Sequence, residues 1–191
     1  MKIDKNGINK SWTLFLDRDG VINRQIKGDY VRDISRFEWL PGSQEAITGL
    51  SRLFGRIIIV TNQQGIGKGL MTKTDLDDIH QYLQNSIKSA GGKIDKIYYC
   101  PYLSSENQPC RKPDIGMALQ AKADFPDINF EKSIMVGDSV SDMEFGKNAG
   151  MRTVMINENG AFNKTIKADW EFKDLFSFYQ FCLSVVNSDL I

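Results

Sequence analysis

The sequence has no excess of charge of either sign, no long apolar run and few cysteines or histidines. In a chain of 191 residues, 24 Lys and Arg residues balance 24 Asp and Glu residues, so the surface lacks the basic field that nucleic-acid-binding proteins use. The longest apolar runs, such as residues 57–60, are too short to span a bilayer, and residues 1–11 lack the apolar segment of a signal peptide. We therefore expect a cytoplasmic protein that binds neither nucleic acid nor a membrane.

Cysteine and histidine are scarce enough to be considered one by one. Cys100, Cys110 and Cys182 are an odd number of thiols in a chain without a secretory signal, and disulfides are rare in a reducing compartment. We therefore expect reduced thiols. The single histidine, His80, lies in a segment with helical spacing, and we expect it at the surface or at the boundary of the core rather than in catalysis.

Short apolar segments alternate with segments of helical spacing. The predicted strands, rich in β-branched and aromatic residues, are residues 13–16, 56–60, 96–100, 133–137 and 152–156. The predicted helices are residues 42–54, 73–92, 115–125 and 139–151. Residues 168–186 add a short strand and a closing helix, and Thr74, with Asp77 three residues later, is the expected N-cap of the second helix. The order predicts one α/β domain over residues 1–191, with a doubly wound, Rossmann-like parallel sheet.

Polar side chains follow the predicted strands at the carboxyl edge, where such sheets place their active crevice. These are Asp17 and Asp19, Thr61 and Asn62, Arg111 and Lys112, and Asp138 and Asp142. Crowded carboxylates repel one another unless a cation neutralises them, and all-oxygen ligands suit Mg²⁺. A carboxylate can also attack phosphorus, while a second acid protonates the leaving oxygen and a hydroxyl and a lysine hold the phosphoryl oxygens. The set predicts phosphoryl transfer through an aspartate.

The order DxDG, a strand ending in Thr-Asn, a lysine and then GDxxxD resembles the four motifs of the haloacid dehalogenase (HAD) superfamily of phosphatases. The resemblance implies that Asp17 is the nucleophile and Asp19 the general acid and base. It implies that Thr61 and Lys112 hold the phosphoryl group. Asp17, the main-chain carbonyl of Asp19 and Asp138 would bind Mg²⁺. No segment between Asp19 and Thr61 is long enough for a separate cap domain, so we expect a HAD-like fold with a minimal cap or none.

The segments FLDRDGVIN, GDYV, FEWLPG, VTNQQGIGKG, CRKP and GDSVSDMEFGKNAG resemble more narrowly the D,D-heptose 1,7-bisphosphate phosphatases and the related histidinol-phosphate phosphatases. Tyr30 and residues 65–71 would form short loops over the crevice. The residues expected to contact the substrate are Tyr30, Asn62, Gln63, Gln64 and Arg111. The resemblance implies a small phosphorylated sugar as substrate and a monomeric enzyme.

Two positions leave alternatives open. Asp142 lies one helical turn after Asp138 and either supports the metal through water or caps the helix. Ser139 stands where many relatives carry lysine, which puts in doubt a contact to the distal part of the substrate.

Related phosphatases often carry a structural zinc in the loop before the Arg-Lys pair. The four ligand positions here read Cys100, Tyr102, Gln108 and Cys110, and a closed zinc site needs four nitrogen or sulfur ligands. The sequence therefore argues against zinc. A disulfide requires the loop to bring the two cysteines together, and a reducing cytosol disfavours it.

Three functions fit these features. The leading one is a Mg²⁺-dependent phosphatase with an aspartyl-phosphate intermediate that removes the 7-phosphate of a heptose 1,7-bisphosphate. Hydrolysis of histidinol phosphate uses the same motifs. A non-catalytic member of the fold that binds a partner is the third, although such a protein has no need of Asp17, Asp19 and Asp138 together.

Overall fold

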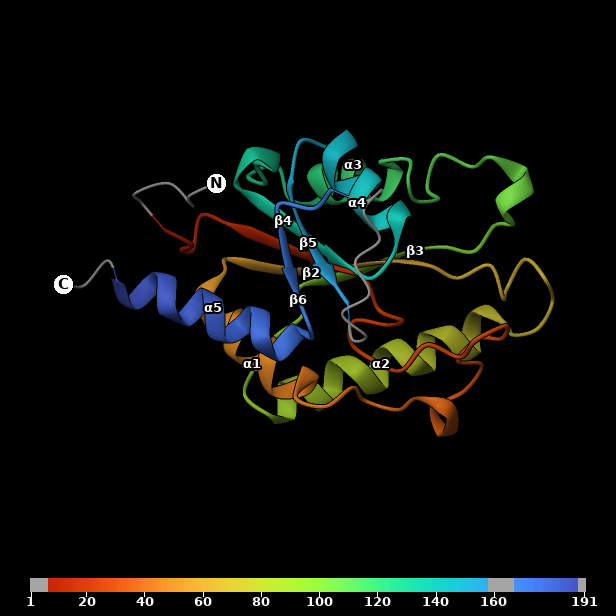
Figure 1. Cartoon of the computed structure of the whole chain (residues 1–191). Coiled ribbons are helices and arrows are strands. Elements are labelled where there is room, and N and C mark those ends of the chain that lie inside the picture. The colour runs from red at the N-terminus through yellow and green to blue at the C-terminus, as the bar shows by residue number, and fades with distance from the viewer. Residues whose placement is uncertain (1–6, 158–166, 189–191) are drawn as a thin grey trace.

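A computed structural model describes residues 7–157 and 167–188, and its centre is a parallel sheet (Figure 1). The described part contains six strands in the spatial order β3-β2-β1-β4-β5-β6, and each neighbouring pair is parallel. The strands are β1 (Thr13–Leu16), β2 (Arg56–Asn62), β3 (Lys96–Cys100), β4 (Ser133–Gly137), β5 (Arg152–Ile156) and β6 (Trp170–Phe172).

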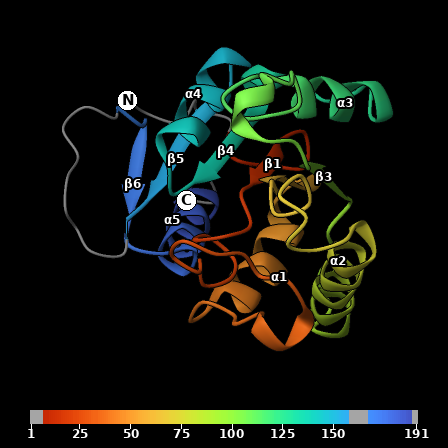
Figure 2. The ribbon, with the colours of Figure 1, turned by 90° about the vertical axis from the view of Figure 1, so that its right-hand side faces the viewer.

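Helices cover both faces of the sheet, as Figure 2 shows. One face packs against α1 (Ser43–Leu53), α2 (Lys73–Ser89) and α5 (Leu175–Ser188), and the other against α3 (Gly116–Asp124) and α4 (Val140–Asn148). Within the described ranges, three short 3-10 helices lie in the connections: η1 (Ile34–Arg36), η2 (Ser104–Glu106) and η3 (Phe130–Lys132). The two apolar cores lie between the sheet and these layers, which is why the inner strands are apolar on both faces.

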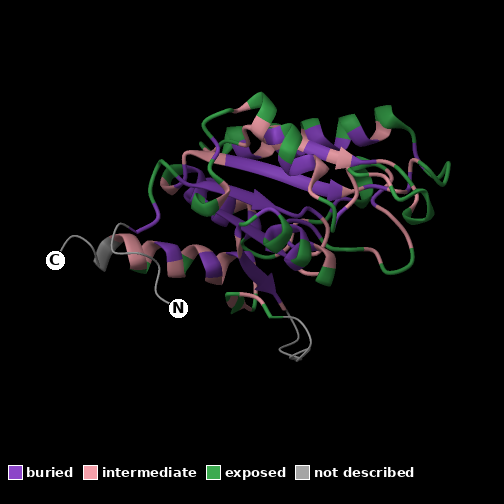
Figure 3. Cartoon of the chain, turned by 90° about the horizontal axis from the view of Figure 1, so that it is seen from above, coloured by how far each residue is buried: buried purple, intermediate pink, exposed green. Residues whose placement is uncertain are grey.

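The chain reverses its direction of winding at β1 and β4. Strands β2 and β3 lie on one side of β1, and β4, β5 and β6 lie on the other. Leu16 is level with Ile59 of β2 and Val136 of β4, so the residues after β1 and β4 meet at one edge. Every residue of β1 and β4 is buried (Figure 3). The doubly wound α/β fold is therefore confirmed, and its switch point places Asp17 and Asp138 together.

Two local expectations differ from the structure. Strand β2 continues to Asn62, two residues beyond the predicted range of 56–60, so Thr61 and Asn62 end the strand as the motif implies. The N-cap of α2 is Thr72, not Thr74, and Thr72 forms a reciprocal capping box with Asp75. Both threonines have an aspartate three residues later, so the local pattern allowed either start.

No helix within residues 7–157 and 167–188 is both long enough and apolar enough to cross a membrane.

Candidate active site

A cavity of about 540 Å³ opens at the carboxyl edge of the sheet. Nine of the ten candidate residues line it: Asp17, Asp19, Tyr30, Thr61, Asn62, Gln64, Arg111, Lys112 and Asp138. Asp142 and Ser139 line it as well. The exception is Gln63, which is fully buried. Residues that are up to 121 positions apart in the sequence, from Asp17 to Asp138, thus line one cavity, as the strand-end rule predicted.

Lys112 lies at the floor of this cavity between two carboxylates. Its Nζ is 2.7 Å from Oδ1 of Asp17 and 2.5 Å from Oδ1 of Asp142, and it donates to the carbonyl oxygen of Val60 at 2.9 Å. Burial alone would lower the pKa of Lys112, but the charges of Asp142 and Asp17 raise it well above its usual range. The lysine is therefore a fixed cation.

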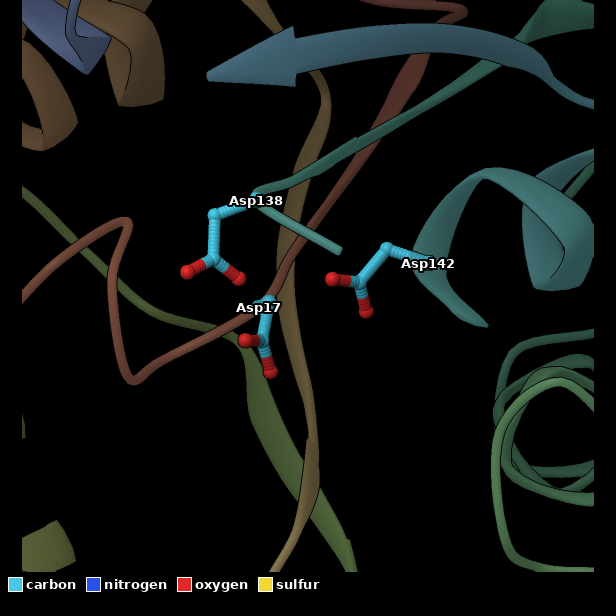
Figure 4. A group of neighbouring side chains, drawn as sticks. All are labelled: Asp17, Asp138 and Asp142. Atoms are coloured by element: carbon cyan, nitrogen blue, oxygen red, sulfur yellow. The ribbon is translucent and has the colours of Figure 1, made fainter. Parts of the chain in front are cut away.

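Three carboxylates face one another (Figure 4), and Lys112 pairs with two of them. Asp17, Asp138 and Asp142 each place an oxygen within 4.8 Å of the others. Burial and mutual repulsion raise the pKa values of Asp17 and Asp138, although Lys112 opposes this effect. Such a group of oxygen ligands fits a divalent cation, because the cation would remove the repulsion.

Gly20 makes the close approach of the β1 loop to Asp138 possible. A Cβ atom at residue 20 would lie 2.0 Å from Oδ2 of Asp138, and the φ of Gly20 is +92°. Both the space and the backbone conformation therefore require glycine after Asp19. This gives a physical reason for the glycine of the DxDG motif.

Asp142, the third residue of α4, takes part in the N-terminal cap of that helix. Its Oδ2 accepts hydrogen bonds from the Ser139 N–H at 3.1 Å and from the Ser139 Oγ at 2.6 Å, and the Ser139 side chain caps α4 in return. The other oxygen of Asp142 forms the ion pair with Lys112. The capping alternative is thus present, and Ser139 has a structural role. Support of a metal through water stays a prediction.

The carboxylate of Asp19 is held by three side chains. Arg18 Nη2 donates to its two oxygens at 3.0 and 2.9 Å, Asn23 Nδ2 to Oδ1 at 2.8 Å and Gln63 Nε2 to Oδ2 at 2.7 Å. Burial would raise the pKa of Asp19, but Arg18 and these hydrogen bonds lower it. Gln63 also donates to Thr61 Oγ1 at 2.9 Å. Gln63 does not line the cavity, and its amide orients Asp19 and Thr61. That Gln63 contacts the substrate stays a prediction.

The remaining predicted residues form the wall. Asn62 fixes the main chain of Lys112: its Nδ2 donates to the Lys112 carbonyl at 3.2 Å, and its Oδ1 accepts from the Lys112 N–H at 3.1 Å. Arg111 donates from Nη1 to the carbonyl oxygen of Tyr102 at 3.4 Å. Lys68 Nζ lies 5.3 Å from the centre of the Tyr30 ring, so the two loops expected over the crevice meet.

Several residues that line the cavity were not predicted: Gln25, Lys27, Lys68 and Ser141. Lys68 lies in the glycine-rich loop that was expected over the crevice, so its position carried a signal. Lys27 is three residues before Tyr30 and is exposed. Loop side chains have no periodicity from which to infer their direction.

His80 is buried, contrary to the expectation of a surface or boundary position. It is 7% exposed, and its Nε2 lies 3.3 Å from Nη1 of Arg18. The buried residues of α2 are Leu76, Ile79, His80, Leu83 and Ile87. This spacing places His80 on the apolar face of the helix.

Cys100 and Cys110 form a disulfide, contrary to the expectation of reduced thiols. Cys100 ends β3, and the following loop returns so that the two Cα atoms are 5.4 Å apart. The expectation rested on the redox conditions of a compartment, which say nothing of how the loop folds. Arg111 and Lys112 directly follow Cys110, so the disulfide ties the segment that carries both cations to the sheet.

We expect reduction of this disulfide to lower the free energy of unfolding by about 2–3 kcal/mol, because the cross-link closes a short loop of the unfolded chain. Urea unfolding with and without a dithiol reductant measures the change. The control is the double variant Cys100→Ser/Cys110→Ser, whose stability should not respond to the reductant. Equal effects of the reductant on both proteins would contradict the prediction.

Comparisons with known proteins agree with this geometry. The HAD-hydrolase-like family model matches residues 109–174. The D-glycero-alpha-D-manno-heptose-1,7-bisphosphate 7-phosphatase of Mycobacterium tuberculosis is 44% identical over 169 residues, which cover 84% of this chain and 89% of that protein. The enzyme of the same name from Campylobacter jejuni is 37% identical over 172 residues, which cover 90% and 97%.

A solved structure is also similar. The crystal structure of D,D-heptose 1,7-bisphosphate phosphatase from B. bronchiseptica, complexed with magnesium and phosphate, matches with a TM-score of 0.82 at 28% identity. The match covers 91% of this chain and 98% of that chain.

The parallel sheet, its switch point and the crevice with carboxylates and a lysine define a phosphatase of the HAD-like class. Within that class, the chain belongs to the family of D-glycero-D-manno-heptose-1,7-bisphosphate 7-phosphatases. The resemblance drawn from the four motifs is confirmed.

Proposed function

We propose that this phosphatase removes the 7-phosphate of D-glycero-D-manno-heptose 1,7-bisphosphate in a Mg²⁺-dependent reaction. The observation that carries the proposal is the placement of Lys112 between Asp17 and Asp142, beside Asp138. A fixed cation next to a carboxylate nucleophile is what transfer of a dianionic phosphoryl group requires. The relatives named for this reaction support the substrate.

The reaction would proceed in two displacements at Asp17. In the first, the Asp17 carboxylate attacks phosphorus, the bond to the sugar oxygen breaks, and Asp19 gives that oxygen a proton. Because Arg18 and the hydrogen bonds lower the pKa of Asp19, Asp19 must take up this proton before the step. In the second, Asp19 takes a proton from water, which attacks the aspartyl-phosphate, releases inorganic phosphate and restores Asp17. Lys112 and the Thr61 hydroxyl would hold the phosphoryl oxygens, and both line the cavity.

Mg²⁺ would be held by the carboxylates of Asp17 and Asp138 and by the main-chain carbonyl of Asp19. The raised pKa values of Asp17 and Asp138 support this assignment, because burial and the neighbouring carboxylates disfavour their charged forms unless a cation is present. When bound, the ion would neutralise charge on the phosphoryl oxygens as the transition state forms.

A second anionic group on the substrate is supported by the outer part of the cavity. Lys27, Lys68 and Arg111 line it in addition to Lys112. Lys27 and Lys68 are exposed and therefore lie toward its mouth. Asp29 lines the cavity too, but it pairs with Arg32 and Arg36. A bisphosphate would provide a counter-charge for the three outer cations, which a single phosphate at Lys112 would not. This observation favours heptose bisphosphate over histidinol phosphate, which has one phosphate and a cationic amine.

We expect phosphate release to be fastest with a heptose 1,7-bisphosphate and to be lost when EDTA removes divalent cations. The relatives' names include both the alpha and the beta anomer, so the assay compares the two anomers, histidinol phosphate and simple sugar monophosphates. Activity should return on addition of Mg²⁺. A large preference for histidinol phosphate would show that this compound, and not the heptose bisphosphate, is the substrate. No metal-dependent turnover on any compound would favour the non-catalytic alternative.

A further inference from the structure

Arg18 is a fully buried cation that does not line the cavity. Its side chain is 0% exposed, and a buried charge is costly unless its hydrogen-bonding groups are satisfied. Nη2 donates to both oxygens of Asp19, and Nε lies 3.4 Å from Oδ1 of the same residue. Nη1 is turned the other way, toward α2, where it lies 3.3 Å from Nε2 of His80. The guanidinium therefore connects Asp19 to α2.

The chemistry of this contact fixes the form of His80. An arginine side chain has donors and no acceptor, so a hydrogen bond to Nη1 requires a lone pair on Nε2. The proton of the neutral imidazole must then be on Nδ1. His80 lies one helical turn from Leu76 and one from Leu83, and both are fully buried, so little water can replace the imidazole as an acceptor.

We propose that His80 is a positioning residue that fixes the general acid and base Asp19 through Arg18. This rests on the proposed function, which assigns proton transfer to Asp19. Asn23 and Gln63 each hold one oxygen of Asp19, and Arg18 is the group that contacts both. The orientation of the carboxylate therefore depends on where the guanidinium lies. Among the described residues, His80 is the partner that the guanidinium has on its other side.

The competing explanation is that His80 only fills space in the core. The two explanations differ in what they require of residue 80. Space filling is satisfied by an apolar side chain of similar size, whereas positioning requires an acceptor at the place of Nε2. Glutamine offers such an acceptor in its Oε1 atom, and leucine offers none.

The first test measures the hydrogen bond itself, without reference to activity. His80 is the only histidine of the chain, so the ¹⁵N signals of its imidazole are assigned without further variants in untagged protein. We expect the tautomer with a proton on Nδ1 and a bare Nε2 near neutral pH. We also expect Asp19→Asn, which removes a charged partner of Arg18, to shift these signals. The opposite tautomer, or no shift, would overturn the proposal.

The second test compares His80→Leu with His80→Gln in steady-state kinetics with the best substrate. We expect His80→Leu to lower kcat by about 10- to 100-fold with little change in KM, because a displaced catalytic group slows the chemical step. His80→Gln should restore most of kcat. The matched control is Leu83→Ala, which lies on the same face of α2 and should lower stability without lowering kcat below the unfolding temperature.

The outcomes separate this proposal from the proposed function. Equal kcat values in the leucine and glutamine variants, or an equal loss in Leu83→Ala, would mean that His80 acts only in packing. Full activity of Asp19→Asn would instead remove Asp19 from the reaction, and the proposed function would fail at that step whatever the tautomer of His80. The proposed function and the role of His80 are both supported if the wild type turns over substrate, Asp19→Asn and His80→Leu lose activity, and His80→Gln recovers it.

Discussion

Replacing the nucleophile, Asp17→Asn, is expected to lower phosphate release by at least about 10³-fold, because the amide cannot form the aspartyl-phosphate. The change is small in volume, and an asparagine carbonyl can still accept the hydrogen bond that Lys112 donates to Oδ1 at 2.7 Å. The loss should therefore occur in a folded protein. Single-turnover release of inorganic phosphate measures it, with a melting curve recorded on the same sample.

The matched control is Asp127→Asn. Asp127 carries the same charge, but its side chain is 69% exposed and pairs with Arg56 away from the cavity. It should retain full activity. A second measurement identifies the attacking group: beryllofluoride with Mg²⁺ should raise the melting temperature of the wild type by binding to Asp17 in place of a phosphoryl group, and should leave Asp17→Asn unchanged. Turnover by Asp17→Asn close to that of the wild type would contradict the assignment.

The strand-end rule found most of this site because it depends only on topology. Asp17, Thr61 and Asp138 end or follow strands whose apolar composition is easy to recognise, and parallel strands place such residues at one edge. Lys112 follows β3 only after a loop that the disulfide closes, so the strand pattern indicated it less directly than it indicated the residues at the strand ends. The fold and the reactive part of the site were thus predictable.

Direction of side chains was less predictable. Gln63 follows Asn62 in an extended segment, where successive side chains point to opposite sides, so Gln63 shares the side of Thr61 and donates to it. That periodicity would have placed Gln63 and Asn62 on opposite sides of the segment, whereas the resemblance implied that both contact the substrate. For His80, the spacing with Leu76 and Leu83 already indicated the buried face of α2. Both signals were in the sequence.

The disulfide could not be predicted in this way. Cys110 lies ten positions after Cys100, and that separation is compatible with a loop that brings them together or one that does not. The loop makes a contact with a distant segment, in which the Pro101 carbonyl accepts from the Gly67 N–H at 3.0 Å. Contacts of this kind are tertiary, and local pattern does not contain them.

The second large effect is expected for Lys112→Met, which should abolish activity and also destabilise the fold. The side chain of Lys112 is 2% exposed and pairs with Asp17 and Asp142, whose side chains are 11% and 1% exposed. Methionine fits the space but leaves two buried carboxylates without a counter-charge. Removing one partner of a buried ion pair costs about 3–5 kcal/mol. Urea unfolding in EDTA measures the loss, and phosphate release should fall by at least about 10²-fold.

The double variant Lys112→Met/Asp142→Asn separates the two effects. If the stability loss comes from an uncompensated charge, neutralising Asp142 should return part of it, and activity should stay absent because Lys112 is no longer there to hold the phosphoryl group. Added Mg²⁺ should also stabilise Lys112→Met more than the wild type, since the ion supplies positive charge to Asp17 and Asp138. Wild-type stability of Lys112→Met in EDTA would mean that the carboxylates are already neutral without the lysine. The raised pKa values of Asp17 and Asp138 would then mean that both side chains are protonated when no metal is bound. Protons and metal, rather than Lys112, would neutralise the charge at this edge of the sheet.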